Sequence, residues 1–373
     1  MTLVVIGWTI LGMALLGVAF NLLAAGLLRR PAPVRAPEPL PAVTILKPLA
    51  GAEPALELRL ESVYAQAYAA PVQIVFGVAD GQDPALAIAR QVASRHPDIA
   101  SDFVVDATCS GPNRKLSNLA NMAGSARHPV IVAADSDIGW APDTLARLVA
   151  RLMTPGVGLV SCRHAGCGDA GFWSQLAAMD ISYRFMPSVV LGAATGLAQP
   201  AMGPTMAFSA DTLARIGGFA AFAHRLADDY EIGRSVRALG LRTELSDVLV
   251  THGCRAPTLA DLFVQELRWS ITIFRIDPAG FVGSVLTHAV PLALVGLLLL
   301  PDIAAGAVLA LALGARLAVK RRMDRLARRS SGALILLPLR DLLSFAVFCA
   351  TFFTDKVDWR GSQFRVTRDG RLF

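Results

Sequence analysis

Long apolar stretches stand at both ends of the chain, and shorter ones alternate with polar residues between them. Residues Thr2 to Leu28 carry no ionisable side chain, and at about 1.5 Å per helical residue this run can cross a bilayer core of about 30 Å. Arg29, Arg30 and Arg35 follow it. A signal peptide carries its positive charge before the apolar run, so this order instead predicts an uncleaved anchor, residues 1–28, with the following chain on the cytoplasmic side.

The C-terminal part has a similar pattern. Residues 281–319 predict a transmembrane hairpin with its turn at Pro301 and Asp302. A basic loop is expected over residues 320–332, on the cytoplasmic side. Arg316 interrupts the second arm. We therefore expect this arm either to extend the guanidinium to the membrane surface or to tilt.

A further apolar segment covers residues 333–354 and contains Arg340 beside Asp341. An ionised pair in the middle of a membrane is costly. The segment is therefore expected to be re-entrant, interfacial or packed against protein, if it does not cross the membrane fully. The tail, residues 355–373, is rich in arginine, which favours a cytoplasmic location.

Residues 42–275 alternate short apolar runs with amphipathic ones. This pattern predicts strands connected through helices in a mixed, mostly parallel α/β sheet. A Pro- and Arg-rich linker, residues 29–41, joins this domain to the anchor. The expected strands begin near residues 42, 72, 101 and 130, and the expected helices cover residues 54–66, 83–97 and 116–126.

Composition agrees with a membrane-bound chain, because 54% hydrophobic and 17% charged residues are unusual for a soluble enzyme. The arginines behind the net charge of +6 border apolar spans. Anionic lipid head groups are therefore the expected partners, and nucleic acid is not. Cys162, His164 and Cys167 lie close together, but no second Cys or His pair follows at zinc-site spacing. Reduced, structural thiols are the simpler interpretation.

Two predicted strands end in acidic residues. Asp80 follows the run VQIVFGVA, and Asp135 and Asp137 form a D-x-D pattern after VIVAA. Open α/β sheets bind ligands at the carboxyl ends of their strands. In an extended segment residues i and i+2 face the same side, so both D-x-D carboxylates are expected to reach one ligand set. Mg²⁺ or Mn²⁺ needs only one or two such carboxylates besides substrate phosphates. Asp80 alone also suits a turn before Gly81.

Two more polar clusters follow in the domain. Lys115 and Asn118 stand at a predicted helix start, where amide and ammonium donors suit a diphosphate or a pyrimidine edge; a solvated surface is the alternative. Asp228 and Asp229 begin another predicted helix. Adjacent acids repel, which favours a raised pKa on one of them, as a general base requires. An acidic first turn also stabilises a helix without any chemistry.

The last motif is QELRW, which places Gln265, Arg268 and Trp269 on a predicted helix. Arginine can pair with a departing diphosphate, and tryptophan can line an acceptor cleft. An amphipathic helix at a membrane surface would have the same pattern, and both interpretations are compatible. His252, in VTHGCR, is expected to be a packed histidine rather than a diphosphate ligand.

Taken in this order, the motifs resemble membrane-bound, inverting glycosyltransferases with a GT-A fold, specifically the ceramide glucosyltransferase-like family. The segments that carry the resemblance are VTILKPLAGAEP, FGVADGQDPA, GPNRKLSNLANM, ADSDI, AMGPTMAFSADTLARIGGF, LADDYEIG and QELRW. Within that family, ADSDI and LADDY are most similar to the bacterial hopanoid-biosynthesis glycosyltransferases. The resemblance covers nearly the whole chain and implies a cytoplasmic GT-A catalytic domain, residues 42–275, flanked by transmembrane helices of the inner membrane.

The resemblance also implies roles for the motif residues. It implies that Asp80 contacts uracil and ribose, that Asp135 binds the ribose or the metal's water, and that Asp137 binds Mg²⁺ or Mn²⁺. Lys115 and Asn118 match positions of the donor site. The remaining matches are Asp229 as general base with Asp228 as the competing assignment, and Gln265, Arg268 and Trp269 at the leaving group and acceptor.

The implied function is transfer of N-acetylglucosamine from a UDP-sugar donor to a lipid acceptor in the membrane, the hopanoid polyol bacteriohopanetetrol. Glucose transfer to ceramide is the alternative. A processive polysaccharide synthase shares the aspartates and the Q-x-x-R-W motif. One short apolar hairpin is a small surface to line a polymer channel, which disfavours this alternative. A noncatalytic scaffold is disfavoured because none of the expected acids is replaced.

Overall fold

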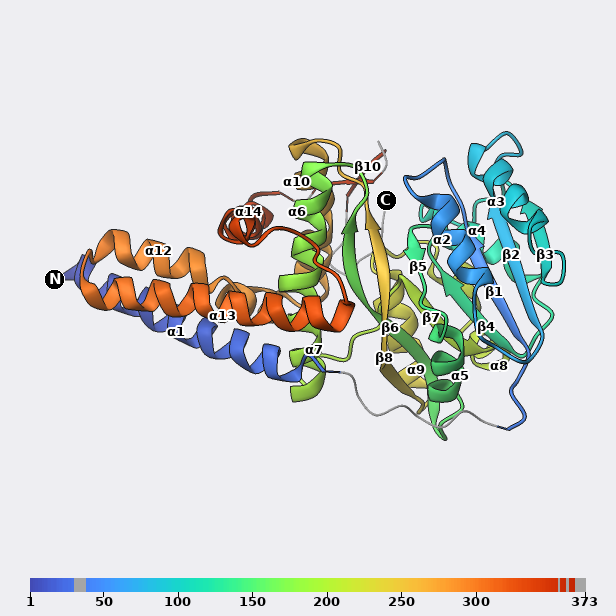
Figure 1. Ribbon diagram of the computed structural model, residues 1–373, viewed down its shortest axis with the longest axis horizontal. Helices are drawn as coiled ribbons and strands as arrows, with labels where there is room; N and C mark the ends of the chain where they lie inside the picture. The colour runs from blue at the N-terminus through green and yellow to red at the C-terminus, as the bar shows by residue number, and fades with distance from the viewer. Residues whose placement is uncertain (30–37, 355, 360–361, 366–373) are drawn as a thin grey trace. The chain divides into compact units, whose positions relative to one another are not determined.

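The computed structural model describes residues 1–29, 38–354, 356–359 and 362–365, with side chains up to residue 354 (Figure 1). These residues divide into two compact units. The sheet unit contains residues 38–164 and 199–255, and the helical unit contains residues 1–29, 165–198 and those from 256 onward. Most of the predicted linker and of the C-terminal tail lies outside the described residues.

Within the described residues, the sheet unit is built on an eight-stranded sheet of order β3-β2-β1-β4-β7-β6-β8-β5. The strands β3, β2, β1 and β4 run parallel, β7 is antiparallel to both β4 and β6, and β5 is antiparallel to β8. The predicted mixed α/β sheet is therefore confirmed. The bounds are β1 (Val43–Pro48), β2 (Val72–Val78), β3 (Ala100–Val105), β4 (Val130–Ala134), β5 (Ile138–Gly139), β6 (Val157–Gly168), β7 (Thr205–Ser209) and β8 (Arg242–Cys254).

The two faces of the sheet bury alternate residues of the same strands. Ile45 and Ile74 belong to the core on one face, and Leu46 and Val75 belong to the core on the other. A strand covered on both faces favours a continuous apolar run, which is why β4 has the sequence VIVAA. The helices of this unit are α2 (Leu56–Tyr64), α3 (Pro84–Ser94), α4 (Arg114–Ala123), α5 (Thr144–Leu152), α8 (Ala210–Arg215) and α9 (Asp228–Ala238).

In the helical unit, two long helices, α1 (Thr2–Leu27) and α13 (Ile303–Ala327), lie side by side with the shorter α12 (Ala289–Leu299) (Figure 1). Its other helices are α6 (Phe172–Asp180), the π-helix η1 (Ile181–Phe185), α7 (Met186–Thr195), α10 (Leu259–Ile276), α11 (Pro278–Gly283) and α14 (Leu337–Ala350), which the short turn η5 (Thr351–Phe353) extends. A small antiparallel pair, β9 (Lys356–Trp359) and β10 (Ser362–Arg365), follows them.

Three helical segments of the described chain are long and apolar enough to cross a membrane: Thr2–Leu27, Ile303–Ala327 and Leu334–Phe353. A fourth candidate is the pair Pro278–Thr287 and Ala289–Leu299, which is bent by 66°. The first arm of the predicted hairpin is therefore broken rather than straight. Pro291 explains the break, because it has no N–H to donate to the carbonyl four residues earlier, at Thr287.

The second arm also differs from the prediction. Helix α13 continues to Ala327, so the predicted basic loop of residues 320–332 is helical over most of its length. The Arg316 guanidinium does not extend to the surface, because it is buried and forms a bidentate ion pair with Asp341 of α14, at 2.8 and 2.7 Å. It also donates to Asn21 Oδ1 of α1, at 3.2 Å. The charged residues of the last apolar segment are thus packed against protein.

Candidate active site

Asp135, Ser136 and Asp137 connect β4 to β5 in a turn, not in the extended conformation that we predicted. The Ile138 N–H donates to the Asp135 carbonyl at 3.2 Å and closes this turn. The premise that residues i and i+2 face one side therefore fails here. The two carboxylates instead contact different partners, described below.

Two buried polar groups hold the backbone of this D-x-D turn. The Lys47 Nζ donates to the carbonyls of Asp135 and Ile138, at 2.5 and 3.3 Å. The Ser136 hydroxyl donates to Glu53 Oε2 at 2.6 Å. Burial lowers the pKa of Lys47 to about 8, although nearby carboxylates oppose this effect. Sequence reasoning missed Lys47, and its only signal was a lysine inside the otherwise apolar strand β1.

The first D-x-D carboxylate pairs with a lysine. Lys115 Nζ lies 2.6 Å from Asp135 Oδ1. Burial alone would lower the pKa of Lys115, but the carboxylates of Asp135 and Asp228 outweigh burial and raise it. Lys115 is therefore a firmly charged ammonium that interacts with both the D-x-D turn and the acidic pair of α9.

The second D-x-D carboxylate lies beside a histidine. The pairing of β5 with β8 sets Ile138 opposite His252, and His252 Nε2 lies 3.4 Å from Asp137 Oδ2. Burial lowers the pKa of His252, but Asp137 outweighs this and raises it. The ring also packs against His164, with centroids 5.3 Å apart. His252 is thus packed, as predicted, but it is also part of the site. No local sequence signal shows this, because the contact depends on strand register.

Asp137 has the features of a metal ligand. Its Oδ1 is buried and has no hydrogen-bond partner among the described residues, which leaves an acceptor available to a cation. The described residues contain no cluster of three or more His, Cys, Asp or Glu side chains that could hold a metal ion by themselves. The protein therefore offers Asp137, with His252 beside it, and the other ligands would be diphosphate oxygens and water, as is common for Mg²⁺.

Asp228 and Asp229 begin α9, but their environments differ. Asp229 accepts hydrogen bonds from the backbone N–H groups of Gly203, at 2.9 Å, and Tyr230, at 2.8 Å. Asp228 Oδ2 is buried and accepts no hydrogen bond from any described residue. Burial raises the pKa of Asp228 to about 6 against the attraction of Lys115, and burial also raises the pKa of Asp229. Asp229 is thus an oriented carboxylate, whereas Asp228 keeps one oxygen unsatisfied in the described chain.

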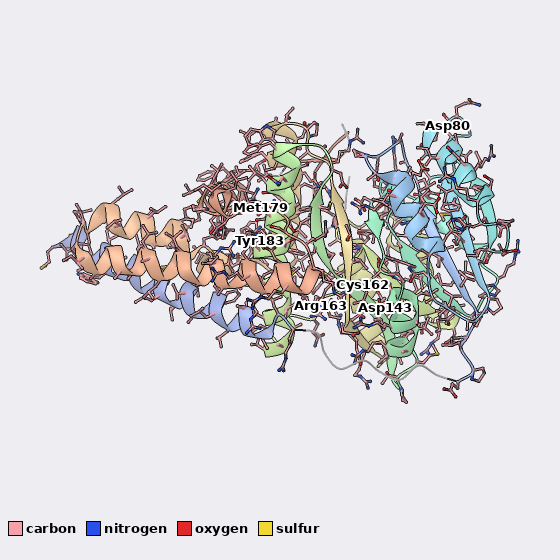
Figure 2. All side chains as sticks on the ribbon, viewed as in Figure 1. Asp80, Asp143, Cys162, Arg163, Met179 and Tyr183 are labelled. Carbon is pink, nitrogen blue, oxygen red and sulfur yellow. The ribbon has the colours of Figure 1, made fainter. Side chains whose placement is uncertain are left out.

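Asp80 and Asn118 make local contacts in the sheet unit. Asp80 lies beyond the end of β2 (Figure 2), where its exposed carboxylate accepts a hydrogen bond from the Gln82 N–H at 2.9 Å. This is the turn geometry that we considered as the alternative. Asn118 donates to the Gly77 carbonyl of β2 at 2.8 Å and so connects α4 to that strand. Their donor-binding roles stay predictions.

Gln265, Arg268 and Trp269 lie on α10, so the predicted helix is confirmed. The Arg268 guanidinium carbon lies 6.0 Å from the centroid of the Trp269 ring, within reach of a cation–π contact. These three residues belong to the helical unit, whereas the aspartates belong to the sheet unit. Their participation in one site stays a prediction.

Comparison with known proteins identifies the family of this chain. The model of "Glycosyl transferase family 21" matches residues 9–372. Ceramide glucosyltransferase 1 of Caenorhabditis elegans is 23% identical over 235 residues, which is 62% of this chain but 50% of that protein. Ceramide glucosyltransferase 3 of the same organism is 20% identical over 347 residues, covering 89% of this chain and 74% of that protein. The chain thus spans about half the length of the first relative.

A solved structure shares the fold. It is a mannosyltransferase from Pyrobaculum calidifontis in complex with GDP-mannose and Mn²⁺, with a TM-score of 0.53 and 22% sequence identity. The match covers 94% of this chain and 99% of that one. The likeness confirms the predicted GT-A fold together with the long apolar helices near the chain ends.

Proposed function

Because this chain belongs to glycosyl transferase family 21, we propose that it transfers a sugar from a UDP-sugar to the hydroxyl of a membrane lipid, with inversion at the anomeric carbon. The observation that carries the proposal is the cluster in the sheet unit where Lys115 lies between the D-x-D turn and the acidic pair of α9. A charged ammonium among carboxylates is suited to a site for a metal-bound diphosphate.

The proposed binding of the UDP-sugar rests on the charged side chains of the site. Lys115 would contact the diphosphate, and Asp137 with His252 Nε2 beside it would hold Mg²⁺ or Mn²⁺. When bound, the ion neutralises the charge that develops on the departing UDP. Asp135, Asp80 and Asn118 are proposed to contact the nucleoside part, on the resemblance of their motifs.

The acidic pair supplies the proposed base. As the acceptor oxygen bonds to the anomeric carbon, its proton moves to the Asp229 carboxylate, and the bond between that carbon and the UDP oxygen breaks with its electron pair leaving on UDP. Two backbone hydrogen bonds support Asp229 in this role because they fix the direction of its carboxylate. The raised pKa and unpartnered oxygen of Asp228 favour it as the second candidate. Gln265, Arg268 and Trp269 are proposed to contact the leaving group and the acceptor.

The acceptor and the sugar are the least constrained parts. The matched relatives are named ceramide glucosyltransferases, which favours glucose transfer to ceramide over the N-acetylglucosamine and hopanoid prediction. The hopanoid prediction rests only on the sequence similarity of the ADSDI and LADDY motifs. Three to four candidate membrane helices support an acceptor held in the bilayer. We further propose a multi-pass location in the inner membrane, with the sheet unit in the cytoplasm near anionic head groups.

The test uses membranes that contain the full chain. They are incubated with labelled UDP-glucose or UDP-N-acetylglucosamine, with ceramide or a hopanoid polyol, and with or without a chelator. We expect one labelled sugar per lipid and no label after chelation. Label in the hopanoid alone would restore the first prediction, label in a long polymer would indicate a processive synthase, and no transfer from any UDP-sugar would contradict the proposed function.

A further inference from the structure

One face of α10 is docked on the C-terminal helical segment at three successive turns. Glu266 pairs with Arg340 of α14, and the hydroxyls of Ser270 and Thr351 are 2.9 Å apart. Phe274 then stacks edge-on against Phe352, with ring centroids 5.4 Å apart. Residues 266, 270 and 274 are spaced by four, so they share one face of the helix.

The Glu266 contact belongs to a cluster of two acids and two arginines, of which Glu266, Arg340 and Asp180 are buried. Arg340 and Glu266 are 1% and 5% exposed. The Ser344 hydroxyl accepts from Arg340 Nε at 3.1 Å and donates to Asp180 Oδ1 at 2.6 Å. Asp180, in turn, forms a bidentate pair with Arg184 of η1, both distances being 2.7 Å. The cluster connects α10 with α14, α6 and η1, the π-helix that also carries the labelled Tyr183 (Figure 2).

This cluster is poorly suited to stability alone. Glu266 Oε1 and Arg340 Nη1 are both buried without a hydrogen-bond partner in the described part of the chain. Such groups reduce stability, and apolar residues of equal volume often replace a buried ion pair without loss. What an ion pair supplies beyond packing is direction, because its hydrogen bonds fix the rotation of one helix against another.

The rotation of α10 decides where the QELRW side chains point. A helix turns by about 100° per residue, so Gln265, Arg268 and Trp269 lie together on a face about 100° away from Glu266. The Phe274 contact lacks the directed hydrogen bonds of an ion pair, and the Ser270–Thr351 hydrogen bond joins neutral groups and is weaker than a charge-assisted one. The ion pair lies inside the motif itself, one residue after Gln265 and two before Arg268.

We propose that the Glu266–Arg340 pair is a positioning device that sets the rotation of α10 and thereby aims Gln265, Arg268 and Trp269 for sugar transfer. The proposal rests on the proposed function, because it assigns the motif a part in transfer. Neither Glu266 nor Arg340 touches the substrate in this role.

The test replaces the pair by apolar residues of similar volume, Glu266→Leu with Arg340→Met, in the full membrane-bound chain. Packing is retained but direction is lost, and a misplacement of about 1 Å can lower turnover roughly 100-fold. We expect kcat to fall by about 10- to 100-fold, the KM for the UDP-sugar to change by less than about twofold, and the thermal midpoint to stay near that of the wild type.

The matched control removes the other buried pair of α14, with Arg316→Met and Asp341→Leu. The hydrogen bonds of Arg316 in the described chain join α13 to α14, α1 and η1 rather than to α10. The kcat of this control should stay within about twofold of the wild type. If kcat falls equally in both double variants, or stays at the wild-type value in the first, the Glu266–Arg340 pair only supports the fold. If the first variant does not fold, Arg340→Lys decides the matter, because it keeps the positive charge but loses the planar, directed contacts of the guanidinium. An unchanged kcat in that variant contradicts the proposal. A wild type without any transfer refutes the proposed function instead.

Discussion

The two carboxylates of the D-x-D turn differ in what they can still bind. Asp135 already has an ammonium 2.6 Å away, at Lys115. The Asp137 carboxylate lies 3.4 Å from the imidazole of His252 and keeps one buried oxygen without a hydrogen-bond partner in the described chain. A cation would therefore be attracted to Asp137 rather than to Asp135. A similar contrast recurs in the acidic pair, where Asp229 accepts hydrogen bonds from two backbone N–H groups and Asp228 keeps one buried oxygen without a partner in the described chain.

This contrast leads to a prediction for turnover. Asp229→Asn should lower kcat by roughly 10² to 10⁴, the usual contribution of a positioned base, while UDP-sugar binding stays largely intact. Asp228→Asn should have a much smaller effect on kcat. Steady-state kinetics and calorimetric binding of the donor check both variants. A larger loss in Asp228→Asn would transfer the base assignment to Asp228.

A second residue-scale prediction concerns pH and stability. The pKa of Asp228 is about 6 in the folded chain, above the ordinary value of 3.8. The folded state therefore holds this proton longer, and stability falls as the pH rises from about 4 through 6, by up to about 3 kcal/mol. Asp228→Asn removes this effect. Its thermal midpoint, relative to the wild type, should be higher at pH 8 than at pH 5, in detergent without nucleotide or divalent ion. If the difference in thermal midpoint between the variant and the wild type is equal at both pH values, this prediction is wrong.

At the scale of elements, strand pairing assembles the candidate metal site. Strand β5 is only two residues long, Ile138–Gly139, yet its pairing with β8 brings His252 to Asp137. The broken first arm of the predicted hairpin is another feature of this scale, since the chain bends by 66° between Thr287 and Ala289 within a mostly apolar run. Helix α10 shows the same dependence, because its rotation is determined by partners on α14.

The β5–β8 pairing gives a prediction for metal binding. His252→Ala should weaken Mn²⁺ binding in the presence of UDP by roughly 10- to 100-fold, the usual effect of losing a group at or beside a metal ligand. Asp137→Ala should abolish the binding. Titration of the Mn²⁺ electron paramagnetic resonance signal measures both, and His224→Ala, which alters an exposed histidine of the same unit, is the control. Unchanged affinity in His252→Ala would exclude this histidine from the metal site.

At the scale of the whole molecule, charged residues are placed where apolar helices can contain them. The described part of α13 and α14 buries Arg316 and Asp341 against each other, so a candidate span can carry them without exposing a charge to lipid. The surfaces of α1 and α13 meanwhile expose large apolar side chains, among them Leu16, Leu23, Ile303 and Leu311. Such surfaces suit lipid rather than water.

These surfaces predict how the chain fractionates. It should stay in the membrane pellet after an alkaline carbonate wash, because spanning helices are not released by a loss of electrostatic attraction. Immunoblotting of pellet and supernatant measures this. A peripheral protein that binds head groups through its arginines alone would appear in the supernatant, and that result would contradict the candidate spans.

The sequence by itself determined the elements whose signals are local. Apolar runs of the right length predicted α1 and the central strands. The sequences of the motifs indicated the family and identified the aspartates as candidate site residues. These signals suffice because burial on both faces requires a continuous apolar run, and an anchor requires a span without charge.

The tertiary structure decided which side chains meet. The turn at Asp135–Asp137, the contact of Asp137 with His252 and the support from Lys47 all join residues that are distant in the sequence or depend on backbone closure. The pairing of Arg340 with Glu266 and of Arg316 with Asp341 likewise joins different helices. Local pattern cannot predict such contacts, because a strand's register and a helix's rotation are set by the surfaces packed against them.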